Sequence, residues 1–201
     1  VIQLGLLLFY MNQKAGFHID ELWTYSLSNS LNTRPIFNDN YGNKELELYN
    51  RWLSGDYFKN LLTVQQDEKF NYKKVRENQV NDGTHPPLYY YIINTICSLF
   101  PDSFSKWYGL SLNIIVFILS QVLLFQISKN ILPNKFALLC VFFYGFTAAA
   151  INTFVYIRMY ALLSFFFLLI TYIYINAFKS NNYLYIFLSV FFCVFLGAHT
   201  H

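Results

Sequence analysis

Residues Trp107–Ser128 read WYGLSLNIIVFILSQVLLFQIS, which is 22 residues without a charged side chain. At a rise of about 1.5 Å per residue, a helix of this length crosses the roughly 30 Å hydrocarbon core of a bilayer. Three further apolar runs follow closely, over Phe136–Ile157, Tyr160–Phe178 and Tyr183–Ala198. A shorter run, Val1–Met11, is interpreted as the tail of a first span. The sequence therefore predicts an all-α polytopic membrane protein.

The composition agrees with lipid as the solvent for much of the chain. Of the 201 residues, 55% are hydrophobic and 12% are charged, whereas soluble domains carry about a quarter charged residues. Every acidic residue lies between Asp20 and Asp102, and the net charge of +3 is too small to indicate nucleic-acid binding. Cys97, Cys140 and Cys193 lie singly in apolar segments and are interpreted as packing residues.

The polar segment Asn12–Lys106 is predicted to be a large extracytoplasmic loop, and residues 107–201 to hold four further transmembrane helices. Within the loop, Leu88–Phe100 would form a helix of about 20 Å, too short to span, so it is predicted to lie at the interface. The lysines of Lys129–Lys135 and Lys179 then come to the face opposite the loop. Lysines in short connections mark the cytoplasmic side, so the loop is predicted to lie outside a cell (plasma) membrane.

The loop is also predicted to have local structure of its own. Apolar residues recur at helical spacing over Ile19–Leu31 and Glu45–Leu62, which indicates two helices. Weak alternation over Phe70–Val80 indicates a strand. A loop of this length is far beyond ordinary connections, so it is expected to be functional.

Two groups of polar residues in the loop are candidates for chemistry. Asp20 and Glu21 stand where the first span leaves the membrane. Asp20 fits either a helix cap or a general base that takes a proton from an acceptor hydroxyl. Asp82 is the first residue of an Asp-Gly turn signal, and His85 lies between that turn and Pro86-Pro87. Asp82 fits either a turn residue or a binding residue, and His85 is favoured as a binding residue.

Two more candidate groups lie among the spans, on the loop's side by span count. Arg158, with Tyr160 close behind it, fits either an interfacial anchor or a bidentate ligand of a phosphate. His199 and His201 follow the last apolar run. Since residues two apart point to different sides of a helix, these two histidines are not expected to form a metal pair.

Three motifs occur in order along the chain: Phe17-His-Ile-Asp-Glu21, His85-Pro-Pro-Leu-Tyr-Tyr90 and Arg158-Met-Tyr-Ala-Leu-Leu163. Together they resemble the bacterial branch of glycosyltransferase family 39, which is related to the dolichyl-phosphate-mannose protein mannosyltransferases and belongs to the GT-C superfamily. The resemblance implies a multispan enzyme with juxtamembrane helices in its first outer loop. It also implies inverting transfer of a sugar from a polyprenyl-phosphate donor to an acceptor hydroxyl on a protein, lipid or glycan.

On this resemblance, Asp20 is the general base and Glu21 its neighbour in the acceptor site. Asp82 and His85 line the pocket, and Arg158 faces the lipid phosphate. The remaining expected substrate-binding residues are Lys106, Tyr160, His199 and His201. Lys106 stands where many relatives carry an arginine, which leaves that phosphate contact open, and this stretch by itself is expected to be inactive.

No cofactor is required by a polyprenyl-monophosphate donor, although Asp20, Glu21 and Asp82 offer the oxygen ligands of a divalent cation. Two other classes stay open. A transporter or flippase of lipid-linked sugars keeps charged or broken-helix sites near the bilayer midplane, and a non-catalytic assembly subunit has no use for the Asp20-Glu21 pair.

Overall fold

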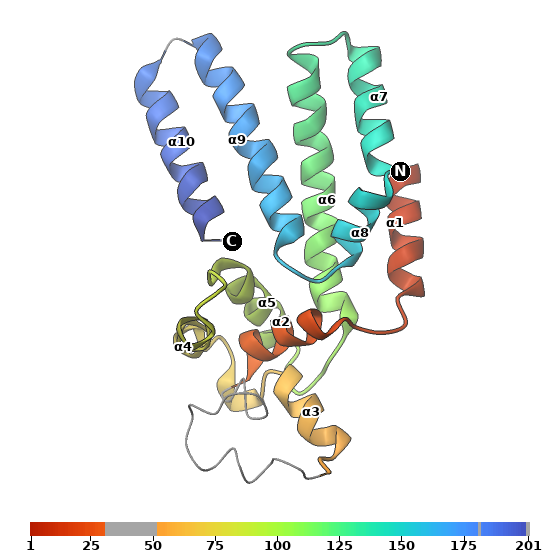
Figure 1. The fold of residues 1–201 in the computed structure, drawn as a ribbon, viewed down its shortest axis with the longest axis vertical. Coiled ribbons are helices and arrows are strands. Elements are labelled where there is room, and N and C mark those ends of the chain that lie inside the picture. Colours follow the sequence, from red (N-terminus) through yellow and green to blue (C-terminus); the bar gives the residue numbers. More distant parts are fainter. Residues whose placement is uncertain (31–51, 181, 200–201) are drawn as a thin grey trace. The chain divides into compact units, whose positions relative to one another are not determined.

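The computed structural model describes residues 1–30, 52–180 and 182–199, and its regular structure within these ranges is helical (Figure 1). The chain divides into two compact units. The membrane unit comprises Val1–Phe17 and Gly109–His201, and the loop unit comprises His18–Tyr108. The loop predicted over Asn12–Lys106 covers most of the loop unit, and its extracytoplasmic side stays a prediction.

The membrane unit holds the apolar helices. They are α1 (Ile2–Gln13), α6 (Lys106–Lys129, whose first residues belong to the loop unit), α7 (Asn134–Gly145), α8 (Ala148–Val155), α9 (Tyr160–Ser180) and α10 (Tyr183–Ala198). By length and composition, α6 and α9 suffice to cross a membrane, and the bent pair α7–α8 makes a third if it is one span. This confirms the predicted class, an all-α membrane protein.

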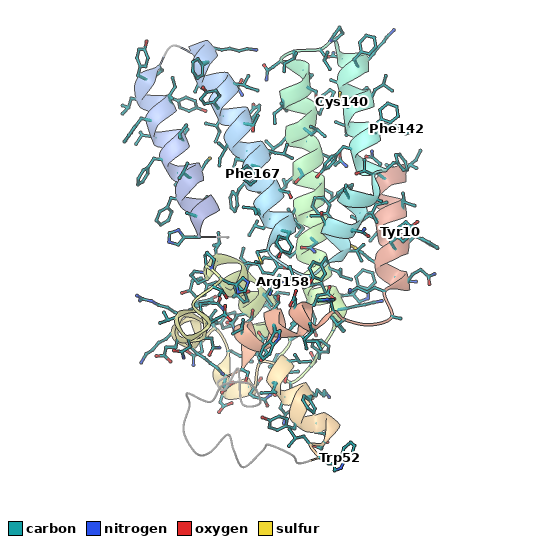
Figure 2. All side chains as sticks on the ribbon, viewed as in Figure 1. Tyr10, Trp52, Cys140, Phe142, Arg158 and Phe167 are labelled. Atoms are coloured by element: carbon teal, nitrogen blue, oxygen red, sulfur yellow. The ribbon has the colours of Figure 1, made fainter. Side chains whose placement is uncertain are left out.

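Aromatic side chains cover the outside of this unit. Tyr10 on α1, Phe142 on α7 and Phe167 on α9 are all exposed and point away from the helix axes (Figure 2). In water such a surface is unusual for a folded protein. It is the surface expected of helices whose surroundings are lipid.

The predicted run Phe136–Ile157 is two helices rather than one, because α7 and α8 meet at 60°. The second helix has its own start: Thr147 is the N-cap, and its hydroxyl accepts from the Ala150 N–H at 3.1 Å. A break of this kind leaves backbone groups that need partners where no water reaches them.

Gln3 of α1 supplies partners near the break. Its amide nitrogen Nε2 donates to the carbonyls of Val141 and Phe142 at 2.8 and 2.9 Å. Gly145 lies so close that a Cβ placed there would be 2.5 Å from Gln3 Nε2 and 2.7 Å from Gln121 Nε2. A side chain at the end of α7 would therefore displace the ends of Gln3 and Gln121, which glycine leaves in place.

The loop unit is a cluster of short helices. They are α2 (Ile19–Asn29), α3 (Gly55–Leu62), a 3₁₀ turn (Gln66–Glu68), α4 (Tyr72–Asp82) and α5 (Leu88–Ser98). Helix α2 packs against α3, α4 and α5, and α4 packs against α5. The helices predicted over Ile19–Leu31 and Leu88–Phe100 are confirmed, each ending two residues early. Of the helix predicted over Glu45–Leu62, residues 45–51 lie outside the described residues, and the described helix begins only at Gly55.

The strand predicted over Phe70–Val80 is wrong, because this segment forms α4. The side chain of Asn71 caps the helix by accepting from the Lys74 N–H at 3.2 Å. Gly83 ends it in the left-handed region at φ 68°, a conformation that glycine adopts without strain. The two local end signals outweigh the weak alternation between them.

Side chains from α4 and α5 bind the C-terminal end of α2. Asn78 Nδ2 donates to the carbonyls of Leu27 and Ser30 at 3.0 and 2.9 Å, and Asn94 Nδ2 donates to the Ser28 carbonyl at 2.8 Å. The last carbonyls of a helix have no partner within the helix. Buried amides from two other helices provide those partners here, and they tie the loop unit together.

Lys74 adds a charge at the same end of α2. Its ammonium group lies 2.9 Å from Glu68 Oε2 and 3.5 Å from the Asn29 carbonyl. Burial lowers the pKa of Lys74, and Glu68 opposes that effect. A cation at this position is favoured by the helix dipole of α2.

The three cysteines are free thiols, with Cys97 and Cys193 buried and Cys140 half-buried. In the loop unit, burial raises the pKa of Cys97 to about 12. The thiol is therefore neutral at ordinary pH, which agrees with its interpretation as a packing residue.

Candidate active site

The start of α2 carries the first candidate pair. His18 is the N-cap residue: its Nδ1 accepts from the Asp20 N–H at 3.2 Å. Glu21 completes a capping box, since its Oε2 accepts from the His18 N–H at 2.7 Å. The capping role predicted as one alternative for Asp20 thus belongs to His18 and Glu21, which stand three residues apart as the box requires.

This local arrangement separates the two carboxylates. Glu21 is fully buried beneath the first turn of α2. The Asp20 side chain is 42% exposed, and its Oδ2 lies 3.6 Å from His18 Nδ1. Asp20 therefore presents its carboxylate to solvent, whereas Glu21 stabilises the helix start that holds Asp20 in place.

The second candidate pair lies in the turn from α4 to α5. Asp82 Oδ2 lies 2.6 Å from His85 Nδ1, and the Asp82 side chain is 4% exposed against 24% for His85. The Thr84 hydroxyl donates to the same Asp82 oxygen. The His85 ring also packs at an angle against Tyr90, with 6.2 Å between ring centroids. Asp82 and His85, both predicted to line the pocket, thus form one hydrogen-bonded pair.

Lys106 is the first residue of α6. Its ammonium group lies 5.7 Å from the centre of the Trp107 ring, within the range of a cation–π contact. Lys106 belongs to the loop unit, which also contains Asp20, Glu21, Asp82 and His85.

Arg158 lies in the membrane unit, at the turn between α8 and α9 (Figure 2). Tyr160 is the first residue of α9. Arg158 is 5% exposed, and its backbone N–H donates to the Tyr156 carbonyl at 2.9 Å. Tyr160 is exposed and stacks on Tyr156, with 6.1 Å between ring centroids. Asn113 of α6 holds this turn, because its Nδ2 donates to the carbonyls of Phe154 and Tyr156 at 2.9 Å each.

The exposed face of Tyr160 borders a cavity of about 400 Å³, which is lined by Lys14, Asn152, Thr153, Val155, Tyr156 and Tyr160. Arg158 is not part of this lining. Sequence reasoning missed Lys14, Asn152 and Tyr156. The stretch Asn152-Thr-Phe-Val-Tyr156 lies within the predicted apolar span Phe136–Ile157, and its polar residues at the end of that span are a usable signal.

His199 ends α10 and bonds locally. Its Nδ1 lies 2.7 Å from the Phe195 carbonyl, and its ring packs against Phe195 with 4.1 Å between centroids. His201 lies outside the described residues. Within the described ranges, no group of three His, Cys, Asp or Glu side chains is placed to hold a metal ion.

The loop unit thus contains an exposed carboxylate at a helix start and a buried carboxylate paired with a histidine. The membrane unit contains a buried arginine and a tyrosine-lined cavity in helices fit to lie in lipid. Neither the curated proteins nor the solved structures include a match to the chain. A family model does match: residues 84–198 fit the family described as dolichyl-phosphate-mannose-protein mannosyltransferase.

Proposed function

Because more than half of this chain matches that model, it belongs to the dolichyl-phosphate-mannose-protein mannosyltransferase family, a family of membrane glycosyltransferases, and we propose that it transfers a sugar from a polyprenyl-phosphate donor to an acceptor hydroxyl. The transfer takes place at the extracytoplasmic face of the cell membrane by a single displacement that inverts the anomeric carbon. The acceptor is a hydroxyl group of a protein, lipid or glycan.

The observation that carries the mechanism is the division of roles at the start of α2. His18 and Glu21 take the capping positions, and Asp20 keeps a solvent-accessible carboxylate on a rigid first turn. A general base needs this combination of access and fixed position. The matched residues 84–198 do not include Asp20, so its role rests on this geometry and on the Phe17-to-Glu21 motif.

In the proposed step, Asp20 accepts the proton of the acceptor hydroxyl as its oxygen attacks the anomeric carbon. The bond from that carbon to the phosphate oxygen breaks, and the electron pair leaves with the polyprenyl phosphate. We assign stabilisation of the departing phosphate to Arg158 and Lys106, because cations placed at developing negative charge lower the barrier. Arg158 offers the planar fork that grips two phosphate oxygens.

Asp82, His85, Tyr160 and the C-terminal His199 and His201 are assigned to substrate binding. The displacement needs no metal ion, since the donor is a monophosphate whose charge the protein's own cations neutralise. A divalent cation bound by Asp20 is the alternative. EDTA-treated enzyme that keeps its turnover would support the metal-free form.

Membranes containing the full-length protein test the proposal directly. Polyprenyl-phosphate mannose labelled in the sugar should yield labelled acceptor, whereas a nucleotide sugar offered to donor-depleted membranes should yield none. Transfer from the nucleotide sugar alone would contradict the donor class.

One observation favours a second candidate, a flippase of lipid-linked sugars. The α7–α8 break, with Gln3 bonded beside it, is a broken helix of the kind that transporters use for binding. Reconstituted vesicles separate the two functions, because a flippase moves labelled donor across the bilayer without releasing its sugar.

A further inference from the structure

Three polar atoms meet in the turn between α4 and α5. Asp82 Oδ2 and His85 Nδ1 are 2.6 Å apart, and the Thr84 Oγ1 lies 2.8 Å from the same ring nitrogen and also bonds Asp82 Oδ2. The Asp82 side chain is nearly inaccessible to solvent. The positions of the protons between these atoms determine whether the outer ring nitrogen of His85, Nε2, donates or accepts a hydrogen bond.

A proton must lie between Asp82 Oδ2 and His85 Nδ1. A carboxylate oxygen is an acceptor, and a ring nitrogen without hydrogen is an acceptor too. Two acceptors 2.6 Å apart repel unless a proton lies between them. The Thr84 hydroxyl has a single proton, which its bond to Asp82 uses, so the proton between Asp82 and His85 must be separate. Imidazole nitrogen is a stronger base than a carboxylate, so this proton resides on Nδ1 of His85.

The turn itself builds this pair from neighbouring residues. Asp82 is the last residue of α4, and Gly83 reverses the chain through its left-handed conformation. Pro86 and Pro87 restrict the backbone that enters α5. The pair therefore belongs to one short segment of the loop unit.

We propose that Asp82 is a positioning residue that fixes His85 in the Nδ1–H tautomer, so that Nε2 accepts a hydrogen bond from a hydroxyl of the sugar substrate. In the neutral ring, Nε2 then carries a lone pair and no hydrogen. A sugar phosphate offers hydroxyl groups as donors, whereas its phosphate oxygens are acceptors. An unprotonated Nε2 is complementary to the hydroxyls. The sugar as ligand rests on the function proposed above, but the tautomer does not.

The tautomer is measured by nitrogen NMR of the full-length protein with labelled histidine, at alkaline pH where imidazole is neutral. His85 is assigned by the signal that His85→Gln removes. Its Nδ1 should resonate as a nitrogen that carries hydrogen, and its Nε2 as one that does not. His18 supplies an internal contrast: its Nδ1 accepts from the Asp20 N–H, so it should show the opposite tautomer.

Two substitutions separate the partners of His85. Asp82→Asn, which keeps the size of the side chain and removes its charge, should mix or reverse the tautomer. Thr84→Val should leave it unchanged. An Nε2–H ring in the wild-type protein would overturn the proposal, as would a Thr84→Val variant that reverses the tautomer.

The hydroxyl contact is tested with polyprenyl-phosphate mannose as the probe. Its addition should shift the Nε2 signal of His85 and leave Nδ1 bonded as before. Asp82→Asn should lower kcat/KM at least about tenfold. A site that hydrogen-bonds a substrate hydroxyl loses much of its transition-state binding when its own group no longer accepts that bond. Asp82→Glu should restore part of the loss, and Asn81→Ala, at the exposed neighbouring position, should stay within about twofold of wild type.

An unshifted Nε2 signal at saturating donor would overturn the contact. A protein that transfers no sugar, yet shows the expected tautomer and donor-induced shift, would instead contradict the function proposed above and leave this site in place.

Discussion

Substitution of Asn78 is the strongest single test of which contacts stabilise the loop unit. Its buried Nδ2 donates two hydrogen bonds, to the carbonyls of Leu27 and Ser30 at 3.0 and 2.9 Å. The net contribution of a hydrogen bond is about 1–1.5 kcal/mol, and a buried group left unpaired costs at least as much. Asn78→Ala should therefore destabilise the loop unit by about 2–3 kcal/mol, which is a factor of roughly 30 to 150 in its opening equilibrium.

Hydrogen exchange of the α2 amides, measured on the purified full-length protein, reports that equilibrium. The Ser30 amide, which bonds the Ser26 carbonyl at 2.9 Å, lies next to the deleted contacts and should exchange faster by this factor. Asn81→Ala is the matched control, because Asn81 is the same residue type on the same helix but exposed. Equal protection of the α2 amides from exchange in both variants would refute the conclusion that Asn78 of α4 stabilises the C-terminal end of α2.

Three further outcomes are expected. Gly145→Ala should displace Gln3 from its two carbonyls and cost about 1–3 kcal/mol in thermal stability. Gly5→Ala, inside α1 with nothing within 4 Å of the added methyl, should instead stabilise by about 0.5–1 kcal/mol; similar melting of both variants would count against the close approach. Because burial raises the pKa of Cys97 from 9.0 to about 12, its thiolate fraction at pH 8 should be about a thousandfold below that of an ordinary thiol, and thiol labelling should stay slow until the pH approaches 12. Arg158→Lys keeps charge and loses the bidentate fork, so donor affinity or turnover should fall clearly while expression and membrane insertion stay normal; wild-type kinetics would leave Arg158 as an interfacial anchor.

The spans were predictable because the bilayer imposes a strong rule. Backbone groups in hydrocarbon must bond internally, so an uncharged run as long as Trp107–Ser128 has few options besides a helix. The structure places α6 there, and α9 over the predicted run Tyr160–Phe178. The break between α7 and α8 escaped prediction, since hydropathy is continuous across it. Its signals were Gly145 and the capping residue Thr147, which carry little weight inside an apolar run.

In the loop unit, the residues that begin and end each helix determined the secondary structure more than the periodicity of apolar residues did. Asn71 and Gly83 delimit α4, although the residues between them alternate weakly enough to indicate a strand. At the start of α2, Asp20 has a good capping side chain, but the His18–Glu21 spacing places the cap two residues earlier, at His18. Candidate residues were found by type and position. The Asp82–His85 bond was not, because it depends on the reversal of the chain at Gly83.

The direct test of the central claim is the turnover of Asp20→Asn in the full-length enzyme with polyprenyl-phosphate mannose. This change keeps the size of the side chain and removes the base, so turnover should fall at least about 100-fold while donor binding stays within about twofold. Asp56→Asn is the control, since Asp56 is an exposed acid in the first turn of α3 and should leave turnover unchanged. Turnover of Asp20→Asn within a few-fold of wild type would contradict the assignment of Asp20 as the base.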